Sequence, residues 1–100
     1  MYPKCAHRIT LELLATAKGE TGNREPLQLE FDNHDEIFFI IERIQNKNLF
    51  QNKQQAAEFA IGLKMFSEVM LKNRGLPLFE EFAPAFRNFM KKLKETPVTE

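Results

Sequence analysis

The chain has 100 residues, 43% of them hydrophobic, and its 14 basic and 14 acidic side chains cancel to a formal net charge of zero. This length and apolar content predict a folded domain with its own core and disfavour a disordered chain. The zero net charge disfavours a general attraction to nucleic acid or to an anionic membrane surface. We therefore expect a single α+β domain over residues 1–95, with a frayed tail at 96–100.

The first third of the chain predicts an antiparallel β-hairpin. Apolar and polar residues alternate over 6–14 and again over 26–31, which is typical of half-buried strands. The polar segment 15–25, with Gly19 and Gly22, predicts a long, mobile connecting loop. Strands that are adjacent in sequence most often pair with each other. The positions expected on the buried face are Ile9, Leu11, Leu13, Leu27, Leu29 and Phe31.

A first helix is predicted after the hairpin, although its sequence is rich in β-prone residues. Asn33 is a suitable N-cap, and Glu36 completes a capping box three residues later. Helical periodicity places four isoleucines on one face: Ile37, Ile40, Ile41 and Ile44. Phe39 projects away from that face, so it is either covered by another element or left for a partner.

A second, longer helix is expected from the cap Asn52 to about Arg74, where Gly75 provides a natural C-terminal stop. Apolar residues occupy more than one side of this helix, which indicates a central position packed on several sides. Gly62 lies in its interior and costs about 1 kcal/mol relative to alanine. Its presence suggests the close approach of a neighbouring backbone.

The last quarter carries an apolar stripe at spacings of three and four: Phe79, Phe82, Phe86, Phe89 and Leu93. This period indicates an amphipathic helix whose rings turn inward over the central helix, with a dimer or partner groove as the alternative. Pro84 interrupts the stripe without shifting its phase, so either a kinked helix or a short turn before a second helix fits. The predicted fold is therefore α+β, a two-stranded antiparallel hairpin followed by three α-helices in two-layer packing.

Few residues indicate chemistry. Cys5 and His7 fall on the same side of a strand, but two ligands are fewer than the three or four of a zinc site. His34, the other histidine, has no obvious route to them. The loop 18–23 contains two glycines but lacks the Gly-Lys-Ser/Thr ending of a phosphate-binding loop. We therefore predict no catalytic residue, no metal and no cofactor, and do not expect an enzyme.

Location and charged surfaces can also be anticipated. No signal peptide is visible, and no uncharged apolar run approaches the roughly 18 residues of a membrane span. A lone cysteine fits a reducing compartment, so a cytoplasmic protein is expected. The basic residues Arg87, Lys91, Lys92 and Lys94 are interpreted as a solvated helix face, because no exposed aromatics alternate with them. Neither nucleic acid nor membrane is expected as a partner.

Three stretches resemble one family of proteins: EPLQLEFDNHD at 25–35, GLKMF at 62–66 and PLFEEF at 77–82. The family is a group of small bacterial proteins catalogued as domain of unknown function number 3861. The resemblance implies a bacterial, single-domain protein with no assigned activity. It supplies no catalytic residues to transfer to this chain.

The preferred functional hypothesis is a non-catalytic interaction or regulatory module that forms a homodimer or binds another, unidentified protein. The motive is a small sheet whose edges and apolar face have no partner of their own. The candidate interface residues are Leu27, Leu29 and Phe39. The alternative is a small apolar ligand bound between the hairpin and the C-terminal helix. That cleft would be lined by Met65, Phe66, Met70, Phe82 and Phe86.

Overall fold

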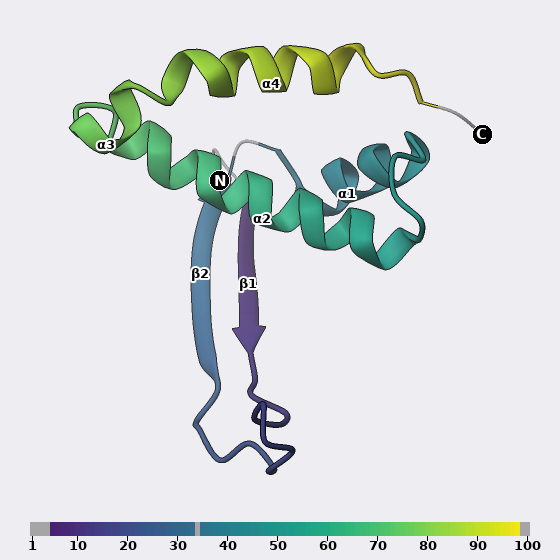
Figure 1. The fold of residues 1–100 in the computed structure, drawn as a ribbon, viewed down its shortest axis with the longest axis vertical. Coiled ribbons are helices and arrows are strands. Elements are labelled where there is room, and N and C mark those ends of the chain that lie inside the picture. Colours follow the sequence, from purple (N-terminus) through teal and green to yellow (C-terminus); the bar gives the residue numbers. More distant parts are fainter. Residues whose placement is uncertain (1–4, 34, 99–100) are drawn as a thin grey trace. The chain divides into compact units, whose positions relative to one another are not determined.

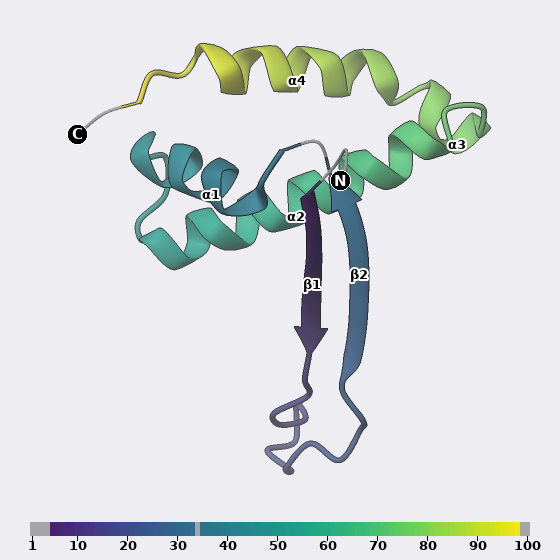
Figure 2. The same cartoon turned by 180° about the vertical axis from the view of Figure 1, so that it is seen from behind.

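The structure, a computed structural model, describes residues 5–33 and 35–98 of the chain. It divides into two compact units, Met1–Glu36 and Ile37–Glu100. The first unit contains strands β1 and β2, and the second contains helices α1 to α4 (Figures 1 and 2). The predicted α+β class, a hairpin followed by helices, is confirmed.

The first unit is an antiparallel hairpin of β1, Cys5–Leu11, and β2, Leu27–Asn33. Ile9 lies opposite Leu29 and Arg8 lies opposite Glu30. Because directly opposed residues share one face of a sheet, this register collects the apolar side chains on one face and the charged ones on the other. The predicted alternation is therefore confirmed, although β1 ends three residues earlier than expected.

The prediction of Asn33 as a helix N-cap is wrong. Asn33 is the last residue of β2, where it lies opposite Cys5 in the strand ladder. The first helix does not begin until Ile37. Asparagine favours caps and turns, but here it forms part of a strand because pairing with β1 satisfies the hydrogen-bonding groups of its backbone.

The connection between the strands has internal structure at its tip. Ala15 forms an isolated bridge with Thr21, and the Thr16 amide donates to the Glu20 carbonyl at 2.8 Å. Gly19 adopts a φ of +84°, a left-handed conformation that suits glycine. A Cβ atom on Gly22 would lie 1.8 Å from the carbonyl oxygen of Leu13. Both predicted loop glycines therefore have a steric reason for their position.

The second unit is a small helical core built around the long helix α2. The helices are α1, Ile37–Asn46; α2, Lys53–Lys72; α3, Pro77–Glu80; and α4, Ala83–Glu95. The α4 helix returns along α2 (Figure 1). Two small residues of α2, Ala56 and Ala60, are buried with Ile44 of α1 and Leu93 of α4. The small side chains of α2 suit the close approach of α1, while α4 reaches α2 through longer side chains such as Leu93 and Phe86, so α2 is packed on more than one side, as predicted.

The ends of α2 follow local rules, but not all of those expected. Asn52 caps the start, because its side-chain oxygen accepts from the Gln55 amide at 2.7 Å. At the other end the Asn73 side chain donates to the Val69 carbonyl at 2.8 Å. The helix thus ends at Lys72, and the prediction that Gly75 terminates it is wrong. The close approach predicted at Gly62 is also wrong, since nothing lies within 4 Å of a Cβ placed there.

The phenylalanine stripe packs within the helical unit. Phe66 of α2 lies 6.1, 6.0 and 6.1 Å, between ring centroids, from Phe79, Phe82 and Phe86. Edge-to-face geometry at this separation is favourable for aromatic rings. The inward orientation is therefore confirmed for Phe79, Phe86 and Leu93, whereas Phe82 and Phe89 keep 43% and 44% of their surface exposed. Pro84 lies in the first turn of α4, so residues 77–95 form two helices and no kinked single one.

A buried lysine links two distant segments of the helical unit. Lys47, in the turn after α1, is 7% exposed, and its ammonium group donates to the Thr96 carbonyl. Thr96 itself follows α4, and its amide bonds back to the Lys92 and Leu93 carbonyls. The α1–α2 turn is thereby attached to the end of α4 across 49 residues of sequence.

Candidate interaction surfaces and a cleft in the helical unit

The residues weighed for metal or thiol chemistry do not assemble into a larger cluster. Within residues 5–33 and 35–98, no three His, Cys, Asp or Glu side chains gather as a metal site would require. Cys5 and His7 share one face of β1, as predicted. The His7 ring stacks on Phe31 of β2 at 5.6 Å, so it packs as a cross-strand aromatic. His34 lies outside the described residues.

The apolar face of the hairpin is the first candidate surface. We call it the hairpin face and define it by Ile9, Leu11, Leu27, Leu29 and Phe31. Its cross-strand pairs are Ile9 with Leu29 and Leu11 with Leu27. Leu11, Leu27 and Leu29 remain 65%, 54% and 44% exposed. The two predicted interface leucines therefore lie on one half-exposed apolar surface.

The opposite face of the hairpin is polar and is tied by an ion pair. The Arg8 Nε donates to Glu30 Oε2 at 2.8 Å, and the side chains are 60% and 66% exposed. Exposed pairs of this kind contribute little stability, about 0.2–1 kcal/mol. The Arg8–Glu30 pair instead distinguishes the two faces of the hairpin, because burying two charged side chains is unfavourable and this face therefore remains exposed to solvent.

Phe39, the third predicted interface residue, belongs to the helical unit. It is 58% exposed on α1, while Ile37 and Ile44 of the same helix are buried. Phe38 beside it is 65% exposed and completes a pair of exposed rings. The helical periodicity that places the isoleucines on the buried face of α1 places Phe38 and Phe39 outside that face. The exposure of Phe38 could therefore have been predicted from the sequence as well.

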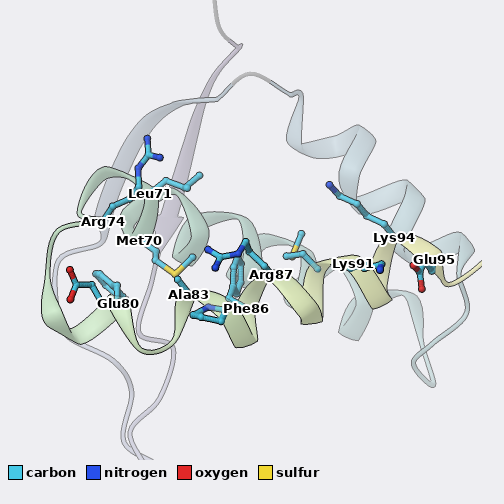
Figure 3. A pocket seen from close by; sticks show the side chains of 13 residues that line it. Met70, Leu71, Arg74, Glu80, Ala83, Phe86, Arg87, Lys91, Lys94 and Glu95 are labelled. Carbon is cyan, nitrogen blue, oxygen red and sulfur yellow. The ribbon is translucent and has the colours of Figure 1, made fainter.

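A cleft of about 890 Å³ lies wholly within the helical unit, between the end of α2, α3 and α4 (Figure 3). We call it the helical cleft. Its apolar lining consists of Met70, Leu71, Phe79, Ala83, Pro84, Phe86 and Met90. Its charged lining consists of Arg74, Glu80, Arg87, Lys91, Lys94 and Glu95.

The helical cleft overlaps the predicted apolar cleft only in part. Met70 and Phe86 line it, but every lining residue lies within 70–95, whereas the hypothesis places the ligand between the hairpin and the C-terminal helix. Phe66 and Phe82 instead pack against each other with their rings 6.0 Å apart, and Met65 is not among the lining residues. The charged border has no counterpart in the prediction, because it arises only when the end of α2 and the side of α4 come together.

A comparison with known protein families identifies the family to which the chain belongs. The family described as "Domain of Unknown Function with solved-structure structure (DUF3861)" matches residues 5–95. The chain belongs to this family, DUF3861. The match includes both strands and all four helices, so the hairpin and the helical unit are both part of what DUF3861 comprises. The resemblance seen in the sequence is confirmed.

A solved relative supports this placement. The chain is similar to a protein of unknown function from Pectobacterium atrosepticum whose crystal structure is known. The two share 36% sequence identity over 92% of this chain and 98% of the other, with a TM-score of 0.78. A comparison with curated proteins found no match. DUF3861 membership therefore establishes the fold without supplying a reaction or a ligand.

The helices were also compared with the requirements of a membrane span. None of those in the described ranges combines the length and apolar character that crossing a bilayer demands.

Proposed function

We propose that this DUF3861 protein is a non-catalytic interaction module that forms a homodimer in the cytoplasm through the hairpin face. The observation that carries the proposal is the exposure of Leu11, Leu27 and Leu29 on one side of a two-stranded sheet. Such a sheet has no second layer within its own unit. Contiguous apolar surface of this kind marks interaction sites in soluble proteins.

The energetics favour a partner for the hairpin. An isolated two-stranded hairpin is marginally stable in water, whereas an apolar face covered by another layer stabilises it. Full burial of one leucine contributes about 1.5–3 kcal/mol. Packing two hairpin faces together would bury Leu11, Leu27 and Leu29 of both copies around a two-fold axis. The free thiol of Cys5 is compatible with the reducing environment of the cytoplasm.

Sedimentation equilibrium tests the proposal on the full chain. We expect a dimer that dissociates as the concentration falls from about 1 mM to about 1 µM, a range that covers moderate affinities. Leu29→Glu places a charge on the hairpin face and should abolish dimer formation. Gln28→Glu is the matched control, because the neighbouring residue carries the same charge to the opposite face. The control should dimerise like the original protein.

Two results would contradict the proposal. A monomer at every concentration excludes self-association of any kind. A dimer that survives Leu29→Glu excludes the hairpin face as its interface. In that case Phe39→Glu becomes informative, since loss of the dimer in that variant would transfer the interface to α1.

The helical cleft supports a second candidate function, the binding of a small apolar ligand. Its volume of about 890 Å³ falls within the range of ligand sites, and methionines 70 and 90 line it. Methionine side chains adapt to ligands of irregular shape. Native mass spectrometry of freshly purified protein tests this candidate. A co-purifying apolar molecule, lost in Phe86→Glu, supports it, and bare protein counts against it.

A further inference from the structure

The border of the helical cleft carries an excess of positive charge that a purely apolar ligand would not use. Four cationic side chains line it, Arg74, Arg87, Lys91 and Lys94, against the two carboxylates of Glu80 and Glu95. Within the residues that the structure describes, no ion pair or side-chain hydrogen bond engages any of the four. Their charges are available to an incoming ligand.

Three of these cations form a row along α4. Arg87, Lys91 and Lys94 are spaced by four and three residues, so they follow one side of the helix (Figure 3). At 1.5 Å per residue the row extends for about 10 Å along the axis. Phe86 and Met90 lie beside it in the same helix and contribute the apolar lining. The cleft thus combines an apolar floor with a linear basic border.

The length of the row restricts the ligand. A single carboxylate or phosphate reaches cations within about 4 Å, so it would engage one end of the row and leave the rest unused. A ligand with acidic groups repeated along its length would match the whole row. An amphipathic α-helix has this form, because acidic residues four and three positions apart follow one flank while its apolar stripe enters the groove.

We propose that the helical cleft is a docking groove for an acidic amphipathic helix of a partner protein. This goes beyond self-association, because it uses a different unit and a different surface. The apolar stripe of the partner helix would contact Phe86, Met70 and Met90. Its carboxylates would pair with Arg87, Lys91 and Lys94, and with Arg74 on the other side of the cleft. Pairs at the edge of an interface speed association and select the partner by charge.

Lys92 provides an internal control. It neighbours Lys91 in α4 and is exposed, but it does not line the cleft. Grouped by sequence alone, Lys92 belongs to the same basic patch as Lys91. The structure separates them, since successive residues of a helix point about 100° apart. Lys91→Glu and Lys92→Glu therefore change the net charge equally and differ in their position relative to the cleft.

The probe is a synthetic, end-capped helical peptide of about 14 residues, four turns, with leucine along one face and glutamate along its flank. A second peptide replaces every glutamate with lysine, and a third keeps the composition but scrambles the leucines. Binding to the full chain is measured by fluorescence anisotropy at two salt concentrations. Laurate, added separately below its micelle concentration, tests the alternative of a single acidic head group on an apolar chain.

We expect the glutamate peptide alone to bind, and to bind more weakly at high salt because the rim charges are exposed. Lys91→Glu should weaken binding about tenfold, and Lys92→Glu should leave it within twofold. Equal binding of all three peptides, equal effects of the two substitutions, or binding of laurate without the peptide would overturn the proposal. Peptide binding should persist in Leu29→Glu, so a failure of the dimer and a failure of the groove are distinguishable.

Discussion

The two units of the chain have equally regular apolar patterns but different outcomes. In the helical unit the stripe of α4 meets α2, and Leu93 at its end is 9% exposed. In the hairpin the alternation is just as clear, yet Leu27 on its apolar face is 54% exposed. The helical pattern is completed within its own unit at Leu93, although Phe82 and Phe89 of the same stripe keep 43% and 44% of their surface exposed, while the hairpin pattern has no buried member among its leucines.

The difference has a geometric origin. A long helix such as α2 offers several sides, so one chain can pack α1 and α4 around it and close a core. A two-stranded sheet has a single apolar face and nothing in the hairpin to lay against it. Sequence periodicity thus tells which face of an element is apolar, but not which molecule covers that face.

The largest expected effect is on the closed core. Leu93→Ala should destabilise the helical unit by about 3 kcal/mol, because Leu93 packs with Ile44 and Ala60 and its loss leaves a cavity. Leu78→Ala is the control, since Leu78 is 76% exposed, and should cost less than about 0.5 kcal/mol. Urea denaturation followed by helical circular dichroism measures both. Similar losses in the two variants would mean that α4 is not part of the core.

The next effect concerns the buried bond between Lys47 and Thr96. Lys47→Met keeps the length of the side chain but removes the donor, and should cost about 1–2 kcal/mol of stability. Lys92→Met, at an exposed position, is the matched control and should be near neutral. The same urea titration applies. An unchanged Lys47→Met would show that the end of α4 does not depend on this bond.

A stabilising substitution follows from the empty space beside Gly62. Gly62→Ala should raise the stability of the helical unit by up to about 1 kcal/mol, because alanine is the better helix former and its Cβ meets no neighbour. Thermal unfolding provides the readout. Gly75→Ala, outside the helices and equally unobstructed, should change the stability less. A destabilised Gly62→Ala would reveal a hidden partner at that position.

The smallest effect is expected on the polar face of the hairpin. A double-mutant cycle over Arg8→Ala and Glu30→Ala should give a coupling energy of about 0.5 kcal/mol, since both side chains are more than half exposed. Amide hydrogen exchange of β1 and β2 measures it. A coupling of several kcal/mol would mean that this face is covered, reversing the assignment of the two faces.

The sequence predicted features that depend on local periodicity and capping. The inward isoleucines of α1, the cap at Asn52 and the apolar positions of the two strands could be found because each depends on residues close in sequence or on simple alternation. The predictions for Asn33 and Gly75 were wrong because each relied on the local preference of one residue. Asn33 pairs with β1 instead of capping a helix, and Asn73 caps the end of α2 before Gly75 is reached.

Features that depend on contacts between distant parts of the chain could not be predicted from the sequence. The bond between Lys47 and Thr96 joins residues 49 positions apart, and nothing around either residue indicates it. The helical cleft depends on where α3 reverses the chain and brings the end of α2 beside α4. Its basic border was visible as a charge pattern, but only the packing separates Lys91 from Lys92.

Amide hydrogen exchange as a function of protein concentration tests the central contrast most directly. We predict that protection of β1 and β2 rises with concentration as hairpin faces become buried between copies, while protection of α2 and α4 stays constant. Protection of the hairpin that is high and independent of concentration would contradict the account, because the apolar face would then be covered within a single chain.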